Sequence, residues 1–336
     1  MLTELISQQL HPRPQSRDFY YLYSSPMKIP ETPATLFGPY GSRLKEMEET
    51  HGQNGISNPA AILNGRVFRE AVHHVAREHL SAGTEVGMTH TFGLRSLLHA
   101  PGELPTYREA LRTHSRILRD AMIETGRKVK EVLSFGPAKD CYRPDPKFTP
   151  QEFADFHGAQ AAEARILNVD AAWFETVNTA SEGVGIALAA KKYKVPAIIS
   201  FVLNREGKLL SGESAGDAIR EVDAASGRYP LGYSFNCCPV EALETALKDC
   251  KRLNGRIIGV YPNASSRNQI ELETSNESVG LKEPLQNARY LNYLAKKWGL
   301  KIVGGCCGYN HRDVALITAA VQQDLHDIRL PQTDLV

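Results

Sequence analysis

The sequence predicts a closed (β/α)8 barrel, a TIM barrel, on three observations. Strand-like and helix-like segments alternate through roughly three hundred residues. Several of the strand-like runs are short and continuously apolar, as strands buried on both faces require. No glycine-rich nucleotide fingerprint follows the first run, which disfavours an open doubly wound sheet. We therefore expect residues 34–330 to form the barrel and residues 1–33 to form an irregular N-terminal extension.

Short apolar runs mark the predicted strands, and capping boxes or prolines after several of them predict helix starts. The expected strands are residues 35–38, 85–92, 129–135, 171–177, 197–203, 231–236, 256–261 and 301–306. The capping boxes are Thr106-x-x-Glu109, Thr149-Pro150-x-Glu152 and Thr179-x-x-Glu182, with Asn310-x-x-Asp313 as a weaker version; Pro239 opens a further helix, and residues 281–299 have helical spacing that ends at Gly299.

The composition favours a cytoplasmic protein and gives no sign of a nucleic acid or membrane partner. Lys plus Arg (39) balances Asp plus Glu (38), and a net charge of +1 gives no electrostatic reason to expect nucleic acid or an anionic membrane as a partner. No apolar run reaches membrane-spanning length, and Pro12 and Pro14 interrupt any signal-peptide core. In a reducing compartment the six cysteines are expected to be ligands, nucleophiles or core residues rather than disulfides. Nothing in the sequence indicates an oligomeric state.

Two pairs of adjacent cysteines follow the sixth and eighth predicted strands. Gly304-Gly305-Cys306-Cys307-Gly308 ends one run, and Asn236-Cys237-Cys238-Pro239 ends the other. Glycines allow the sharp turn that lets consecutive thiolates hold one soft cation, and three thiolates with an open fourth position are typical of a catalytic zinc site. Active sites of such barrels lie at the carboxyl ends of the strands, so both pairs are expected on one rim. The alternative is that these are free cysteines packed in the core.

The cysteine motifs Gly-Gly-Cys-Cys-Gly at 304–308 and Asn236-Cys237 resemble the homocysteine S-methyltransferase family, and the resemblance runs from about residue 35 to about residue 323. The resemblance implies zinc-dependent methyl transfer to the sulfur of homocysteine in a (β/α)8 barrel. It implies Cys237, Cys306 and Cys307 as zinc ligands, with Cys238 as an alternative to Cys237, and Glu175 as the contact for the amino group of the substrate. The motifs that carry it are Gly-Gly-Cys-Cys-Gly at 304–308, Asn236-Cys237, Tyr261-Pro262-Asn263, Ser211-Gly212-Glu213-Ser214 and Phe174-Glu175-Thr176.

The chemistry is consistent with this implication. Only the thiolate is a good nucleophile, and Zn2+ at the open position would favour the thiolate of a bound substrate. That sulfur would attack a methyl group on a sulfonium or quaternary ammonium donor, and we expect S-methylmethionine, S-adenosylmethionine or betaine, because a folate or cobalamin donor needs a much longer chain. Besides Glu175, we predict substrate contacts from Asn236, Gly38 and Thr91. The alternative role for Asn236 is a strand-end cap.

The first strand departs from the family pattern. Relatives usually carry an Asp-Gly-Gly-like motif that helps to bind the amino acid, whereas Phe37-Gly38-Pro39 stands here. The change removes a carboxylate and stiffens a turn. After the second strand, His90 is either a hydrogen-bonded rim residue, a fourth zinc ligand or an acid–base group. Because of the altered first strand, the alternative function is a zinc- and thiol-binding homologue without methyl transfer, acting as a binding or regulatory module.

Loss of zinc would leave three neighbouring thiols. We expect air oxidation of the zinc-free protein to join Cys237 to Cys306 or Cys307, because a bond between the adjacent Cys306 and Cys307 would be strained. We assign no chemical role to Cys141, Cys238 or Cys250. A lyase or hydrolase with a lysine base is disfavoured, because the lysines near the strand ends lie in polar loop stretches.

Overall fold

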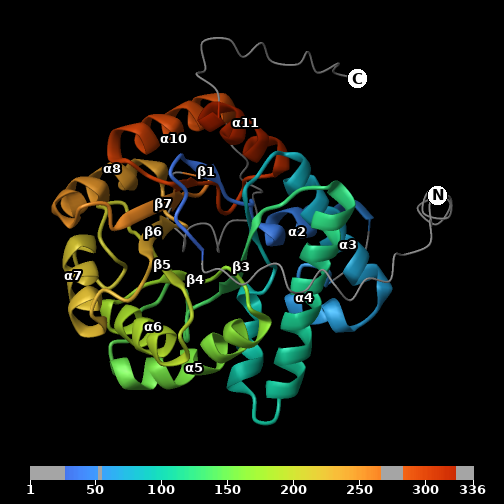
Figure 1. Cartoon of the computed structure of the whole chain (residues 1–336), viewed down its shortest axis with the longest axis horizontal. Coiled ribbons are helices and arrows are strands. Elements are labelled where there is room, and N and C mark those ends of the chain that lie inside the picture. Colours follow the sequence, from blue (N-terminus) through green and yellow to red (C-terminus); the bar gives the residue numbers. More distant parts are fainter. Residues whose placement is uncertain (1–26, 52–54, 266–282, 323–336) are drawn as a thin grey trace.

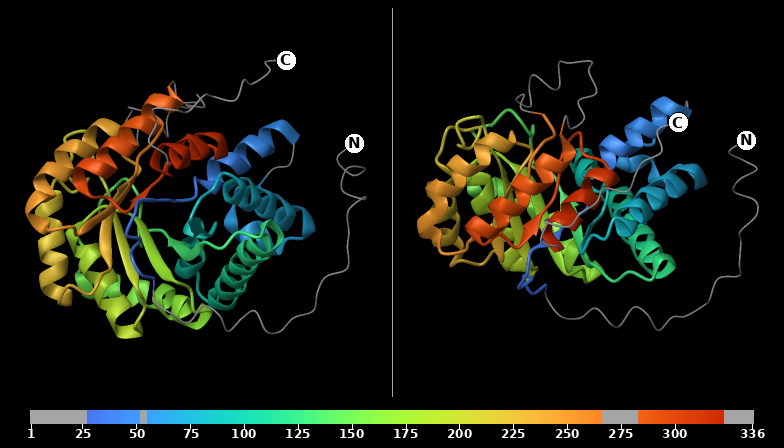
Figure 2. Two further views of the ribbon diagram at one scale, coloured as in Figure 1. Left: turned by 45° about the horizontal axis from the view of Figure 1, so that its top comes forward. Right: turned by 90° about the horizontal axis from the view of Figure 1, so that it is seen from above.

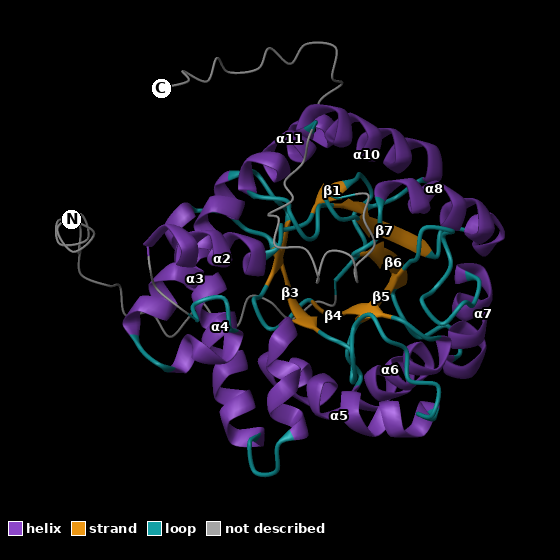
Figure 3. Cartoon of the chain, turned by 180° about the vertical axis from the view of Figure 1, so that it is seen from behind, coloured by secondary structure: helices purple, strands orange, loops and turns teal. Residues whose placement is uncertain are grey.

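The computed structural model describes residues 27–51, 55–265 and 283–322 of the 336-residue chain. Within this part, eight parallel strands form one sheet in the order β1-β8-β7-β6-β5-β4-β3-β2. A parallel bridge between Leu36 and Val86 joins the two edges, and the Phe37 N–H donates to the Val86 carbonyl oxygen at 3.0 Å. The sheet is therefore closed into a barrel, which the helices surround in Figures 1 and 3. The predicted (β/α)8 fold is confirmed.

The strands are buried on both faces, as their apolar composition predicts. All seven residues of β4 are buried. The third to seventh predicted strands agree with the structure within one residue at each end, but the eighth, predicted to reach residue 306, ends at Val303 before the two glycines. The observed strands are β1 (Ala34–Thr35), β2 (Val86–Met88), β3 (Lys130–Phe135), β4 (Ala171–Val177), β5 (Ala197–Val202), β6 (Gly232–Asn236), β7 (Ile257–Tyr261) and β8 (Ile302–Val303).

The helices form a ring around the strands, and α2, α3 and α4 lie together on one side of it in Figures 1 and 2. The helices are α2 (Tyr40–His51), α3 (Arg66–Ser81), α4 (Leu104–Thr125), α5 (Pro150–Leu167), α6 (Ala180–Tyr193), α7 (Ala215–Ser226), α8 (Val240–Asp249), α10 (Pro284–Trp298) and α11 (His311–Gln322). Short 3-10 helices are η2 (Pro59–Leu63), η3 (Phe92–His99) and η4 (Cys250–Leu253).

Most of the predicted helix ends agree with the structure. Thr149 forms the full capping box, and Thr179 caps α6, although the Glu182 carboxylate binds the Ala138 N–H instead of completing the second box. The start predicted at Thr106 is wrong: α4 begins at Leu104, because Pro105 suits the first turn, where its missing N–H is not needed. Asn310 and Asp313 cap each other reciprocally, α8 follows Pro239 directly, and α10 ends at Gly299 with φ 66°.

The described start of the chain lies against the barrel. Residues 27–33 contain no helix or strand, and the Met27 N–H donates to the Asp170 carbonyl oxygen at 3.1 Å. Residues 1–26 of the predicted extension, and the predicted barrel end after residue 322, lie outside the described residues. Among the described helices, none combines the length and the hydropathy that a membrane span requires.

Candidate metal centre

Two turns at the carboxyl ends of β6 and β8 carry the paired cysteines. Cys237 directly follows β6 and has a φ of 47°, a left-handed conformation that costs a non-glycine residue about 1–2 kcal/mol. On the other turn Gly305 has no room for a side chain, because an added Cβ would lie 2.1 Å from Cγ of Tyr309. One turn therefore depends on a left-handed residue and the other on a close approach that only glycine allows.

The sulfur atoms of Cys237, Cys306 and Cys307 meet at the mouth of the barrel, all within 4.8 Å of one another. The Sγ–Sγ distances are 3.9 Å from Cys237 to Cys307, 4.0 Å from Cys306 to Cys307 and 2.7 Å from Cys237 to Cys306. Thiolates bound tetrahedrally to one zinc ion at about 2.3 Å lie about 3.8 Å apart, so two separations match and the third must open by about 1 Å. Within the described ranges, no other His, Cys, Asp or Glu side chains form such a group.

The remaining cysteines lie outside this cluster. Cys238 is fully buried in the core, so the structure brings Cys237 rather than its neighbour to the other two thiols. Cys250 is buried at the start of η4. Cys141 accepts a hydrogen bond from Arg95 Nη2 at 3.1 Å.

The segment that follows β7 joins the two cysteine turns through its backbone. The Cys306 N–H donates to the Pro262 carbonyl oxygen at 2.7 Å, and the Asn263 N–H donates to the Cys238 carbonyl oxygen at 2.9 Å. Because β7 lies between β6 and β8 in the sheet, this segment is placed to hold both turns at once. The Tyr-Pro-Asn motif at 261–263 therefore positions the cysteines.

The three thiols form a soft donor set in which Cys307 is the ionised member, because hydrogen bonds among the thiols and burial leave the pKa of Cys237 and of Cys306 well above that of an ordinary cysteine. Hydrogen bonds from Cys237 and Cys306 lower the pKa of Cys307 well below that of an ordinary cysteine. Cys307 is also the exposed member of the group, which leaves its sulfur accessible. The charge of Cys237 is the main cause that raises the pKa of the Tyr142 hydroxyl, so Tyr142 lies close to the thiols. This donor set suits a thiophilic cation such as Zn2+.

Glu175 is 7% exposed and lies on β4 at the same mouth. The Ser134 hydroxyl donates a short hydrogen bond to its carboxylate, and the Thr91 hydroxyl donates to the Ser134 carbonyl oxygen at 2.7 Å. Burial raises the pKa of Glu175 to about 7, and the charge of Cys307 acts in the same direction. Such a carboxylate gains strongly from a cationic partner, which would favour its ionised form. The substrate contacts of Glu175 and Thr91 stay predictions, and the hydroxyl of Thr91 already supports Ser134.

Asn236 is fully buried, and its amide connects three neighbouring strands. Its Oδ1 accepts from the Thr176 N–H at 3.0 Å and from the Ser200 hydroxyl at 2.7 Å, and its Nδ2 donates to Thr176 Oγ1 at 3.0 Å. Thr176 has a φ of 59°, and the register between β4 and β5 shifts at this point. Asn236 therefore stabilises the irregular end of the strand that carries Glu175, and its predicted contact with substrate stays a prediction.

Gly38 lies at a close approach between elements. An added Cβ would lie 2.8 Å from Cε1 of His79, and Phe37 packs on that ring with 5.2 Å between the centroids. The end of the first strand is thus apolar where the family pattern has a carboxylate. His90 is not part of the cysteine cluster. Its Nε2 is 3.0 Å from the Ser57 carbonyl oxygen, and burial lowers its pKa to about 4.

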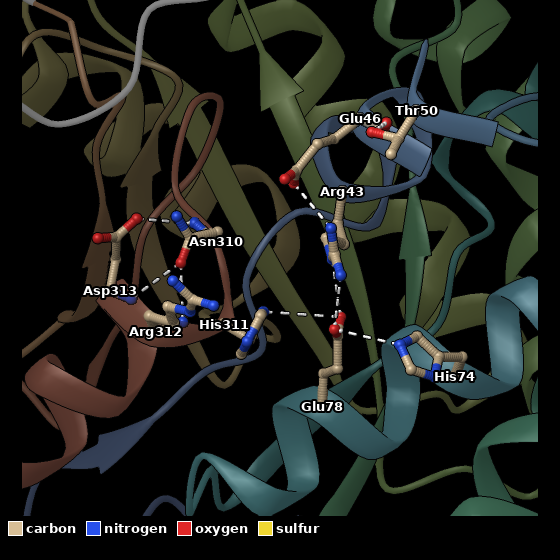
Figure 4. Close-up of polar contacts among 9 residues, drawn as sticks. All are labelled: Arg43, Glu46, Thr50, His74, Glu78, Asn310, His311, Arg312 and Asp313. Carbon is tan, nitrogen blue, oxygen red and sulfur yellow. Dashed lines mark hydrogen bonds and ion pairs between the residues drawn. The ribbon is translucent and has the colours of Figure 1, made fainter. Parts of the chain in front are cut away.

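A charged network fixes the helix that follows the Cys306–Cys307 turn (Figure 4). Glu78 on α3 accepts from Arg43 Nε and Nη2 at 2.9 and 2.8 Å, and its carboxylate lies 3.6 Å from Nδ1 of His311 at the start of α11. Partial burial opposes ionisation, but hydrogen bonds from His74 and Arg43 hold the pKa of Glu78 well below its usual range. The network therefore joins α2, α3 and α11 next to the Cys306–Cys307 turn.

A sequence model of the homocysteine S-methyltransferase family matches residues 36–321, which include both cysteine turns. The chain belongs to the homocysteine S-methyltransferase family. It is 25% identical over 164 residues to homocysteine S-methyltransferase 1 of Zea mays, which covers 47% of this chain and 49% of the relative. It is 26% identical over 164 residues to selenocysteine Se-methyltransferase of Brassica oleracea var. italica, which covers 47% of this chain and 45% of the relative. The chain thus aligns with about half the length of these curated relatives.

A solved structure of the family has the same fold. The metallated form of the homocysteine methyltransferase MmuM from Escherichia coli matches with a TM-score of 0.65 and 20% identity, over 86% of this chain and 96% of that chain. At this identity the likeness concerns the fold.

Three residues near the candidate site carry no sequence signature that singled them out. Ser134 lies within β3 and belongs to no recognisable motif, although the alternation of side chains along the strand could have predicted that it faces inward. Tyr142 and Arg95 lie outside the strands, in a loop and a 3-10 helix at the strand ends, and only tertiary contacts place them at the mouth.

Proposed function

We propose that this family member transfers a methyl group to the thiol of homocysteine or a close analogue, giving methionine or its counterpart, with Zn2+ held by Cys237, Cys306 and Cys307. The observation that carries the proposal is the meeting of these three thiols at the barrel mouth of a homocysteine S-methyltransferase family chain. The name of the Brassica relative, selenocysteine Se-methyltransferase, adds selenium amino acids to the acceptors that we propose.

Zinc in this site would supply a Lewis acid that lowers the pKa of the acceptor thiol. The side chains of the protein hold the acceptor. Glu175 in its carboxylate form pairs with the ammonium group, and Ser134 fixes the orientation of that carboxylate through its hydrogen bond. Burial raises the pKa of Glu175 to about 7 and so opposes its ionisation. A neighbouring ammonium group favours the carboxylate, and the two charges stabilise each other. Positioning the sulfur in line with the donor methyl group then accounts for much of the acceleration.

The methyl donor is proposed to be S-methylmethionine, S-adenosylmethionine or betaine. Each carries its methyl group on a positively charged centre, which suits a mouth lined by thiolates and a carboxylate. The test is to incubate zinc-loaded protein with homocysteine and each donor and to measure methionine by mass spectrometry. We expect methionine from at least one donor and none from a Cys307→Ser variant. No methionine from any donor would contradict methyl transfer.

The alternative is a zinc- and thiol-binding module that does not catalyse methyl transfer. The observation in its favour is the aromatic end of the first strand, where Phe37 packs on His79 in place of a carboxylate that binds the amino acid. Calorimetry with homocysteine discriminates between the two functions. Saturable, zinc-dependent binding without turnover would favour the module, whereas binding with turnover favours the enzyme.

A further inference from the structure

Arg95 carries a guanidinium group at the mouth of the barrel. Ser134 on β3 donates to Glu175, and Gly136 directly follows the strand, which ends at Phe135. An added Cβ at Gly136 would meet Cδ and Nη1 of Arg95, both at 2.9 Å. The guanidinium of Arg95 therefore lies against the carboxyl end of β3, two residues beyond Ser134.

Within the described residues, Arg95 has no carboxylate partner. Its Nη2 donates to the Cys141 thiol at 3.1 Å, its Nη1 lies 3.5 Å from the Phe92 carbonyl oxygen, and the guanidinium lies 4.7 Å from the centre of the Phe92 ring. A thiol is a weak acceptor, so it holds these donors loosely. Arg143, on the loop after β3, is by contrast paired with Asp140 at 3.0 Å. Arg95 thus keeps the fork of donors that binds a carboxylate in bidentate fashion.

The end of the first strand offers few donors to a carboxylate. The Phe37 N–H is already bonded to the Val86 carbonyl oxygen, and Pro39 has no N–H. The turn between β1 and α2 thus has two fewer N–H groups for an anionic ligand, and a cation on another element can bind that group instead. Arg95 on η3 is a cation on the correct side of the barrel for that purpose.

The spacing between the two charges fits one α-amino acid. Ser134 pairs with Trp173 and Phe135 with Phe174, so Glu175 comes level with Gly136, and neighbouring strands lie about 4.8 Å apart. The carboxylate of Glu175 is bonded to Ser134 and the guanidinium of Arg95 lies beside Gly136, so the two charged groups lie at the ends of adjacent strands. An ammonium and a carboxylate on the same carbon, each with a hydrogen bond of about 2.9 Å to its partner, span roughly 6–9 Å. One ligand can therefore contact Glu175 and Arg95 together.

We propose that Arg95 binds the carboxylate of the thiol amino acid whose ammonium group pairs with Glu175. This inference rests on the proposed function and identifies the acceptor as a free α-amino acid rather than a simple thiol or a thiol amine. The bound carboxylate would replace the Cys141 thiol at Nη2, exchanging a weak acceptor for a charged one.

The test compares two ligands by calorimetry on zinc-loaded protein: homocysteine, and 3-aminopropanethiol, which is the same molecule without the carboxylate. Wild-type protein is expected to prefer homocysteine by about 10- to 100-fold, as a charge-assisted contact predicts. Arg95→Met should remove most of this preference and leave the affinity for 3-aminopropanethiol within about twofold. Arg95→Lys, which keeps the charge without the fork, should keep part of it. Arg143→Met is the matched control at the same mouth and should keep the whole preference.

The outcomes separate the two proposals. Equal affinities of the wild type for both thiols, or equal losses for both in Arg95→Met, would overturn the role of Arg95 while leaving the thiol acceptor in place. No binding of either thiol to the zinc-loaded wild type would overturn the proposed function, and this inference with it. If Arg95→Met does not fold, an undiminished preference in Arg95→Lys would overturn the bidentate contact.

Discussion

Replacing Gly305 by alanine tests how the turn at the end of β8 places its cysteines. The new Cβ would lie 2.1, 2.2 and 2.6 Å from Cγ, Cδ1 and Cδ2 of Tyr309, far inside normal carbon contact distances of about 3.5 Å. Tyr309 is 1% exposed, so its ring cannot move away without disturbing the close-packed core. Overpacking costs about 1–3 kcal/mol, and we expect about 3 kcal/mol here because the overlap is with a buried ring. The turn that carries Cys306 should shift as a result.

Thermal unfolding and metal analysis measure these effects. Gly305→Ala should lower the melting temperature by roughly 5 °C and reduce the zinc bound per chain. Gly41→Ala is the matched control, because no atom lies within 4 Å of its added Cβ and it sits in the first turn of α2. That substitution should leave zinc content unchanged and stabilise the protein by up to about 1 kcal/mol. Normal stability and zinc content in Gly305→Ala would refute the reasoning.

Three further predictions concern the surroundings of the site. The lowered pKa of Glu78 makes its stabilisation complete above the ordinary glutamate pKa of about 4.3 and lost as the pH falls below that value. Glu78→Gln should therefore cost about 1–3 kcal/mol at pH 7 and a smaller amount at pH 3 in urea unfolding, and an equal cost at both pH values would contradict the network. Asn236→Ala leaves the Thr176 N–H and the Ser200 hydroxyl unpaired and should cost about 2–4 kcal/mol in the same assay; a change below about 0.5 kcal/mol would show that these bonds do not matter. Zinc-free protein in air should form a disulfide between Cys237 and Cys306, whose sulfurs are the nearest pair at 2.7 Å, in non-reducing peptide maps, and three free thiols would count against the cluster.

The middle of the barrel could be predicted from the sequence because its strands are buried on both faces. β4, with all of its residues buried, matches the predicted run at both ends. The first and eighth strands were predicted too long. Their predicted runs extend to residues 38 and 306, whereas the ladder between β1 and β8 ends at Thr35 and Val303. The start of α4 was missed because the capping pattern at Thr106 competes with a proline one residue earlier.

The cysteine turns could be predicted because paired cysteines at strand ends, one pair flanked by glycines, indicate a site for a soft metal ion. The position in the family motif favoured Cys237 over Cys238, and the structure brings Cys237 to the cluster; its left-handed backbone is a property that the residue type does not reveal. Ser134 and Arg95 could not be found in this way. Their roles arise from the facing of β3 and from the contact between η3 and Gly136, which only the folded chain defines.

Zinc content in single-cysteine variants tests the central claim most directly. Protein purified without chelator should contain about one zinc ion per chain, as a site of three thiolates predicts. Cys237→Ser, Cys306→Ser and Cys307→Ser should each lose most of this zinc, whereas Cys238→Ser, whose sulfur lies outside the cluster, should retain it. Retention of zinc in Cys237→Ser together with its loss in Cys238→Ser, or a wild type without zinc, would contradict the account.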